Sequence, residues 1–284
     1  MGNSVKDLVE IALITALRER MKLNGKTYLP FCLFDYVERQ GIDIKFVEIS
    51  SLEAMYSKDP GPLILLSSLR PHGRQYYNCA HEYGHHLFSH GMKLEELKEN
   101  YGSKSFEPEE FLVDTFAGFF LMPKSTIQRA FHIRGAKVAD FNPINYLRVA
   151  SNLGVGYSTL VFHLFKSLQI IDSSMYNKLK KVSVKEIKKE ILRQEFQGEI
   201  IYVDEYWEGR PIDLQIDDIL VLESDAEFDC DLVDKIDFIN GRVLLKGTKP
   251  GIGKMTFKKS KHSHYLRVSR NKYTGFNKYK HLEE

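Results

Sequence analysis

The residues with the clearest chemical potential lie at positions 78–86, which contain the pattern His-Glu-x-x-His. On an α-helix, side chains four positions apart lie on one face, so the imidazoles of His81 and His85 can bind one tetrahedral metal ion. Glu82 would then sit beside the metal as a general base, because zinc lowers the pKa of its bound water towards about 7. The pattern predicts the helix of a zinc hydrolase.

A catalytic zinc site needs a third protein ligand and an open position. The metzincin pattern requires Gly and His where this chain has Phe88 and Gly91, so that subclass is excluded. Another subclass takes a glutamate from a later helix. Residues 110–123 form an almost wholly apolar stretch with two carboxylates, Glu110 and Asp114, four residues apart. Burying them is costly without compensation, so we expect Glu110 to be the third ligand and Asp114 to orient a ligand histidine.

Other assignments stay open at this point. Glu110 could instead be a solvated residue in the first turn of its helix, and Asp114 could cap a neighbouring element. Glu109 is the main alternative to Glu110 as the third ligand. His86 and His90 flank the predicted metal face. The candidate hydrogen-bond donors to the transition state are Tyr76, Tyr77, His90 and Tyr101.

The elements that must position these residues follow from local patterns. Apolar periodicity predicts helices at residues 5–23 and 31–40, alternation predicts a strand at 42–49, and 50–62 reads as a loop. A short apolar run predicts a strand to which an extended substrate would add by main-chain hydrogen bonds. This substrate-pairing strand consists of Leu63, Ile64, Leu65, Leu66 and Ser67. Gly91 predicts the end of the metal helix, and the polar segment 92–107 is either a solvated connection or a gate.

These features together resemble the ImmA/IrrE family of metallopeptidases over roughly residues 5–170. The resemblance rests on residues 41–44, the strand 63–67, the run 77–85 and the segment 116–123. It implies zinc as the cofactor, with His81, His85 and Glu110 as ligands and Glu82 as the base. It also implies a gluzincin-like endopeptidase whose substrate is a helix-turn-helix repressor of mobile-element or stress genes.

Residues 142–164 indicate two short helices joined by a Gly-containing turn, with contact positions at Leu147, Leu153, Val155 and Leu160. This resembles a helix-turn-helix, but the second helix is only weakly basic, so DNA readout competes with a packing or substrate-recognition role. Residues 178–193 read as one lysine-rich amphipathic helix that connects two units.

The last ninety or so residues predict a small, mainly β domain. Strand-like runs lie at 200–203, 219–222, 243–246, 254–257 and 265–268. Acidic residues dominate 199–237, and no acidic residue occurs in 242–280. Opposite charges on adjoining strands would hold the strand register; the other reading is a basic face from residue 254 to 280 that meets nucleic acid or an acidic partner.

The length and composition indicate the general class of protein. The 284 residues exceed one usual core, and 43% hydrophobic with 27% charged residues is ordinary globular composition. Three widely separated cysteines and the absence of any long apolar run favour a cytoplasmic protein without a membrane partner. We expect an α+β protein with a zincin-like metallopeptidase domain (1–134), a helix-turn-helix-like segment and connector (135–195) and a β-rich sensing or partner-binding domain (196–284).

The sequence therefore predicts a zinc endopeptidase of narrow specificity that acts in transcription regulation. The alternative is a non-catalytic DNA-binding or partner-binding regulator built on a peptidase scaffold.

Overall fold

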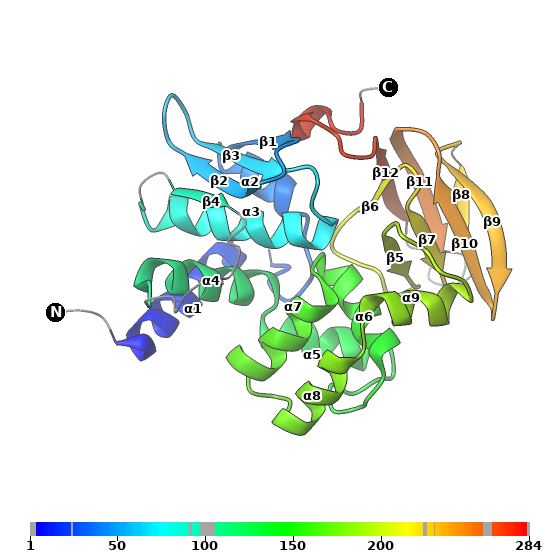
Figure 1. Cartoon of the computed structure of the whole chain (residues 1–284), viewed down its shortest axis with the longest axis horizontal. Coiled ribbons are helices and arrows are strands. Elements are labelled where there is room, and N and C mark those ends of the chain that lie inside the picture. Colours follow the sequence, from blue (N-terminus) through cyan, green and yellow to red (C-terminus); the bar gives the residue numbers. More distant parts are fainter. Residues whose placement is uncertain are drawn as a thin grey trace.

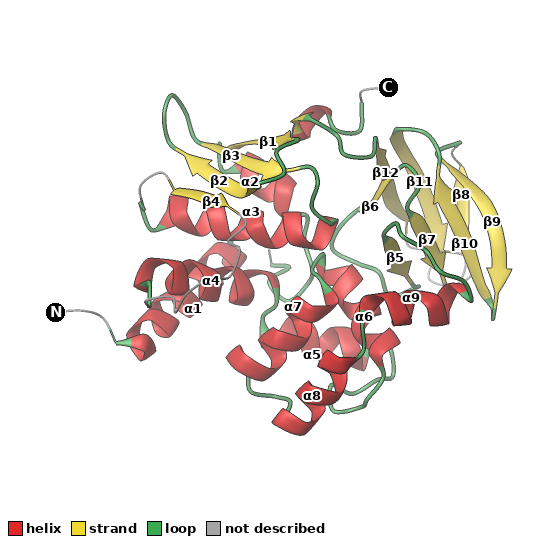
Figure 2. Ribbon diagram, in the orientation of Figure 1, coloured by secondary structure: helices red, strands yellow, loops and turns green. Residues whose placement is uncertain are grey.

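The computed structural model describes residues 4–23, 25–90, 93–96, 106–223, 226–229, 231–257 and 263–282. It is a mixed α+β structure, as expected, with one sheet near the N-terminal helices and two further sheets at the other side of the molecule (Figures 1 and 2). Within these residues no helix is long and apolar enough to cross a bilayer.

The first sheet has the strand order β13-β1-β3-β2-β4, and α3 packs against it (Figure 1). β1 and β3 are parallel, whereas β2, β4 and β13 run antiparallel to their neighbours. The strands are β1 (Asp43–Val47), β2 (Leu52–Ser57), β3 (Leu63–Ser67), β4 (Lys93–Glu96) and β13 (Gly275–Phe276).

Four helices build the rest of this region, with α3 lying between the sheet and α4. α1 begins with a capping box, in which Ser4 accepts from the Asp7 backbone and Asp7 accepts from the Ser4 backbone. α4 has Pro108 at its first position, where a missing N–H costs nothing. The helices are α1 (Val5–Met21), α2 (Leu33–Arg39), α3 (His72–Leu87) and α4 (Pro108–Leu121).

Two expectations about this region were wrong. The presumed loop 50–62 contains β2, a strand that exists because it pairs with β3. The predicted substrate-pairing strand, made of Leu63, Ile64, Leu65, Leu66 and Ser67, is β3 and lies between β1 and β2. Its main-chain groups are already paired on both sides, so no substrate can add to it. The two edge strands of this sheet are β13 and β4, and β4 is the one closer in sequence to the metal helix α3.

The middle of the chain is helical and shares a hydrophobic core with the first region. This core includes buried residues from Leu8 to Leu192. Residues 178–193 are not one helix, because the chain breaks at Val182 and restarts at a capping box of Ser183 and Glu186. The helices are α5 (Lys124–His132), α6 (Pro143–Leu153), α7 (Tyr157–Phe162), a π-helical turn (His163–Ser167), α8 (Ser173–Lys181) and α9 (Val184–Leu192).

α6 and α7 form the expected pair of helices around Gly154, which has φ +77° and ends α6. The four predicted contact positions, Leu147, Leu153, Val155 and Leu160, are all buried. Tyr157 of α7 and His163, at the start of the π-helical turn, are also buried. They contact the backbone of Leu179 and Met122, so only part of that helix is presented to solvent.

The C-terminal residues form two four-stranded sheets, ordered β5-β7-β10-β9 and β6-β12-β11-β8, which share a second hydrophobic cluster. All five predicted strand-like runs are strands. The strands are β5 (Ile200–Val203), β6 (Ile212–Gln215), β7 (Ile219–Leu222), β8 (Ala226–Asp229), β9 (Val233–Ile239), β10 (Arg242–Gly247), β11 (Gly251–Phe257) and β12 (Ser263–Ser269). A 3-10 turn, Asn277–Tyr279, follows β13.

The charge asymmetry of this region is partly used inside it. Arg267 on β12 lies opposite Asp213 on β6 and binds its carboxylate at 2.6 Å and 3.0 Å. Lys246 and Asp217 form an exposed pair, as do Lys249 and Asp231. The contact of Arg267 with Asp213 joins two paired strands and is of the kind that fixes their register, whereas Asp217, Asp231 and Lys249 lie in the connections between strands.

The last described residues return to the first sheet, where Phe276 of β13 pairs with Lys45 of β1. Arg267 also binds Asp35, and Asn277 donates to Glu38, both on α2. The segment assigned from the sequence to 196–284 therefore supplies an edge strand to the sheet of the N-terminal region.

Candidate metal centre

α3 carries the His-Glu-x-x-His pattern in the layer between the first sheet and α4. Of the pattern residues, His81, Glu82 and His85 are all buried. Gly84 lets the two helices approach closely, because a Cβ there would lie 3.1 Å from side-chain atoms of Val113 and Phe116. The close contact of α3 and α4 brings the carboxylates of α4 towards the histidines of α3.

Three donor atoms converge between these helices. His81 Nε2 lies 3.0 Å from His85 Nε2 and 3.3 Å from Glu110 Oε2, and His85 Nε2 lies 3.7 Å from Glu110 Oε2. All three ligand atoms lie within 4.8 Å of one another, and this group is the one metal-compatible cluster among the described residues. Glu110 thus faces the histidines, while its rival Glu109 is exposed and does not belong to the cluster.

Each histidine also has a partner at its other ring nitrogen. His81 Nδ1 lies 2.9 Å from Asp114 Oδ1, and His85 Nδ1 lies 3.0 Å from His90 Nδ1. Ser89, at φ +57°, turns the chain so that the His90 N–H bonds to the His85 carbonyl and its ring returns to His85. Such contacts fix the tautomer and orientation of a metal-binding imidazole, leaving Nε2 for the metal.

A comparison of the sequence with protein-family models matches residues 37–165 to the IrrE N-terminal-like domain, a peptidase family. The chain contains an IrrE N-terminal-like domain. The match includes α3, α4, α6 and α7, and therefore every residue of the metal-compatible cluster. It confirms the family resemblance drawn from the sequence and supports a metallopeptidase-family function for this region. No curated protein matches the chain.

Buried polar contacts fix α3 within the IrrE N-terminal-like domain. Glu53 on β2 binds Arg74 and Asn78 of α3 and also Arg70. Burial alone would raise the pKa of Glu53, but the hydrogen bonds from Arg74 and Asn78 outweigh burial and lower it. Glu53 is therefore an ion that holds the first half of the metal helix on the sheet.

A second anchor fixes the other half of this helix. Glu19 of α1 accepts hydrogen bonds from Tyr83 of α3 and Tyr36 of α2, at 2.6 Å and 2.7 Å. Burial and the bond to Glu19 raise the pKa of Tyr83, so its hydroxyl stays protonated. His86 is directed to Tyr56, with 2.8 Å between Nδ1 and Oη, and is not a metal ligand in this geometry.

The predicted transition-state donors have different positions. Tyr76 is buried, and its hydroxyl accepts from Leu33 N. His90 is directed to His85. Tyr77 Oη donates to the Asp114 carbonyl at 3.0 Å, beside the cluster. Tyr101 lies outside the described residues.

Sequence reasoning did not foresee the roles of His90, Glu53 and Glu19. The sequence shows that His90 lies five residues after His85. It does not show that Ser89 adopts the left-handed conformation that turns the His90 ring back to His85. Glu53 and Glu19 come from elements distant in sequence, and only the tertiary structure brings them to α3.

Proposed function

We propose that the chain is a zinc-dependent endopeptidase of narrow specificity. The observation that carries this proposal is the convergence of His81 Nε2, His85 Nε2 and a Glu110 carboxylate oxygen within 4.8 Å. Two imidazoles and one carboxylate are a donor set used by catalytic zinc, which keeps one further position for water or substrate. Its location in an IrrE N-terminal-like domain supports the peptidase assignment.

The chain's own residues divide the chemistry among them. Bound zinc would supply Lewis-acid polarisation of the scissile carbonyl and would acidify water. Glu82, adjacent to His81 on α3, accepts the proton from the attacking water and passes it to the leaving amine. Asp114 accepts the Nδ1–H of His81, and His90 holds His85 through its Nδ1. These two contacts keep the Nε2 atoms directed at the metal position.

An extended substrate is proposed to add to β4 instead of β3. β4 ends the strand order of the first sheet, and no described strand pairs with its outer side. Adding a peptide strand to a sheet edge satisfies main-chain hydrogen bonds without demanding a particular sequence. The proposed substrate class, a helix-turn-helix repressor of mobile-element or stress genes, rests on the resemblance to the ImmA/IrrE family.

Metal content of Glu110→Ala and Glu109→Ala tests the metal centre. Elemental mass spectrometry after zinc loading and gel filtration should find about one zinc per chain in the parent and in Glu109→Ala, and much less in Glu110→Ala. Equal zinc in both variants would show that Glu110 is not a ligand. A parent protein that takes up no zinc would contradict the proposed function.

A further inference from the structure

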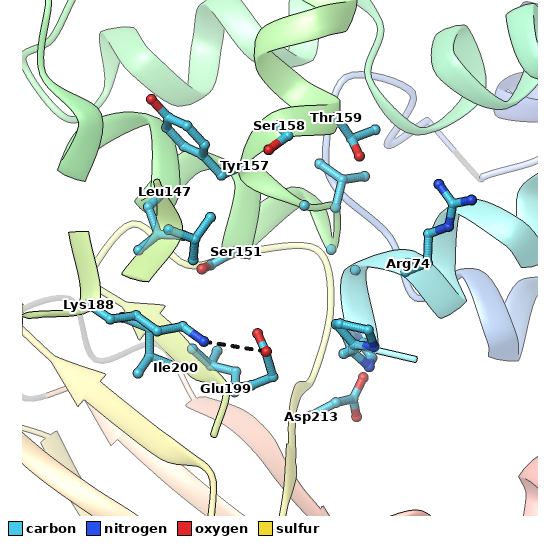
Figure 3. A pocket seen from close by; sticks show the side chains of 18 of the residues that line it. Arg74, Leu147, Ser151, Tyr157, Ser158, Thr159, Lys188, Glu199, Ile200 and Asp213 are labelled. Atoms are coloured by element: carbon cyan, nitrogen blue, oxygen red, sulfur yellow. Dashed lines mark hydrogen bonds and ion pairs between the residues drawn. The ribbon is translucent and has the colours of Figure 1, made fainter. Parts of the chain in front are cut away.

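A cavity of about 430 Å³ lies away from the metal cluster, at the other end of α3. Its walls come from the first turn of α3, the α6–α7 turn, the start of α9, and β5 and β6. Figure 3 shows Leu147 and Tyr157 on one side of this cavity, Ile200 and Asp213 on the other, and Arg74 beside them. The volume is in the range of small-molecule pockets, and no residue of the metal cluster lines it.

The unusual lining residue is Arg210. Its side chain is only 2% exposed, yet its Nε and Nη1 have no hydrogen-bond partner within the described part of the chain. Nη2 donates to His72 Nε2 at 3.1 Å and makes a 3.5 Å contact with Asp213. A buried guanidinium with unused donors is unfavourable unless something supplies acceptors.

Packing keeps the Arg210 guanidinium in this position. It stacks on Tyr76, 4.6 Å from the ring centroid, and lies 5.7 Å from the Trp207 ring. Gly154 gives it room, because a Cβ on this residue would lie 1.9 Å from Nη1. The left-handed φ of Gly154 also favours glycine. The arginine cannot retreat from the cavity without disturbing these contacts.

The acidic lining residues already have stronger partners. Asp213 is bound by Arg267 at 2.6 Å and 3.0 Å, which is closer than its contact with Arg210. Glu199 is paired with Lys188, the contact drawn in Figure 3. Burial and the adjacent Arg210 lower the pKa of His72, so its ring is neutral and accepts from Arg210 without adding an anion. The charge of Arg210 is thus incompletely balanced by the protein.

The first turn of α3 adds to the positive potential. α3 has 16 residues, begins after Pro71 and has no side-chain cap at that end. The N-terminal end of a helix favours anions through its backbone N–H groups and dipole. Gly73 lets this turn approach the α6–α7 turn, since a Cβ there would lie 2.7 Å from Gly156 N. The helix end and Arg210 therefore line the same cavity.

We propose that this cavity binds a small molecule with an apolar body and one anionic group, a carboxylate or a phosphate, that pairs with Arg210. The apolar body would contact walls that include Leu147, Val155, Val184, Phe196 and Ile200. The anionic group supplies the acceptors that Nε and Nη1 lack. This site is additional to the peptidase centre and does not depend on the proposed function.

Trp207 provides a local reporter, because it is the only tryptophan of the chain and its ring lies near Arg210. The probes are 3-phenylpropionate, phenyl phosphate and the neutral 3-phenylpropionamide, titrated into the full chain at constant ionic strength. We expect a saturable change in tryptophan fluorescence with one or both anions, and at least tenfold weaker binding of the amide. The stronger anion identifies carboxylate or phosphate as the preferred group.

Arg210→Met retains the apolar stem and removes the charge, and it should abolish the preference for the anions over the amide. Arg242→Met is the matched control, because Arg242 contacts Tyr202 and does not line the cavity. Equal binding of the amide and the carboxylate by the parent, or no binding of any probe at millimolar concentration, would overturn the proposal. Because this comparison uses the parent protein, it decides the question even if Arg210→Met fails to fold.

Discussion

The Nδ1 atom of His81 and the Oδ1 atom of Asp114 lie 2.9 Å apart, on adjacent helices and 33 positions apart in the chain. The contact leaves His81 Nε2 directed at His85 and Glu110. The Asp114 side chain is 58% exposed, so solvent screens part of this interaction. Its main effect is geometric: it selects the tautomer of His81 that has an unprotonated Nε2.

Asp114→Ala should therefore weaken metal binding without abolishing it. Loss of a hydrogen-bond partner of a metal-binding histidine typically costs about 10–100-fold in affinity, and the exposure of Asp114 favours the lower end of that range. Competition with a zinc chelator of known affinity measures the change. Zinc affinity equal to that of the parent would show that Asp114 does not orient His81.

Glu82→Gln should retain zinc and lose peptide cleavage. The amide keeps the size of the side chain but cannot accept a proton, and general-base catalysis typically contributes about 10²–10⁴-fold. The assay pairs zinc content with hydrolysis of a candidate helix-turn-helix repressor by the zinc-loaded protein. A variant that cleaves at the parent rate would exclude Glu82 as the base.

Acid should destabilise the protein through His163, which is buried and donates from Nε2 to the Met122 carbonyl. Burial lowers the pKa of His163 from 6.5 to about 4. The unfolded chain therefore binds a proton between pH 6.5 and 4 that the folded protein does not, so stability falls as pH falls through this window. The loss from this residue is roughly 3 kcal/mol, at about 1.4 kcal/mol per pKa unit.

His163→Gln retains an N–H donor and removes the titration, so it should flatten the stability profile between pH 6.5 and 4. Urea unfolding at a series of pH values measures the free energy of unfolding, and the comparison at pH 8 isolates any packing cost of the substitution. Parallel profiles for the parent and the variant would show that His163 does not carry this pH dependence.

Arg267→Met should destabilise the protein by roughly 3–5 kcal/mol, because it leaves the buried carboxylate of Asp213 without its main partner. Arg267 binds Asp213 and Asp35, and its side chain is 14% exposed. The double variant Arg267→Met with Asp213→Asn also removes the unpaired carboxylate, so it should recover part of the lost free energy of unfolding. Denaturant unfolding measures both changes.

The exposed pair of Lys249 and Asp231 provides the control for this measurement. Their side chains are 52% and 76% exposed, so solvent screens the pair and Lys249→Met should destabilise the protein much less than Arg267→Met. Equal losses from Arg267→Met and Lys249→Met would contradict a structural role for the buried contact.

The sequence predicted well wherever one local pattern contained the whole argument. The His-Glu-x-x-His spacing needs only a helix, and the spacing of Glu110 and Asp114 puts both carboxylates on the helix face that meets the histidines. Their expected burial was wrong, because the Asp114 side chain is 58% exposed and that of Glu110 is 22% exposed. One local pattern was overlooked. Ser183 and Glu186 have the spacing of a capping box, which predicts a new helix start, but the lysine-rich pattern continues across it and favoured a single helix.

The sequence predicted poorly where pairing or assembly decides the outcome. Residues 52–57 form a strand because β3 lies beside them, and the central position of β3 depends on which strands flank it. The cavity residues His72, Gly154 and Arg210 come from separate parts of the chain and share no periodic pattern. Only the tertiary structure shows that Arg210 has donors left over.

The pairing of β13 with β1 joins residues that are synthesised far apart in time. Phe276 is 231 positions after its partner Lys45. At about 5–20 residues per second, the ribosome needs on the order of 10–50 s to make the intervening chain. During that interval the outer edge of β1 has no native partner strand, and an unpaired edge readily accepts other strands. Nascent chains are therefore exposed to mispairing at β1 until β13 has been synthesised and pairs with it.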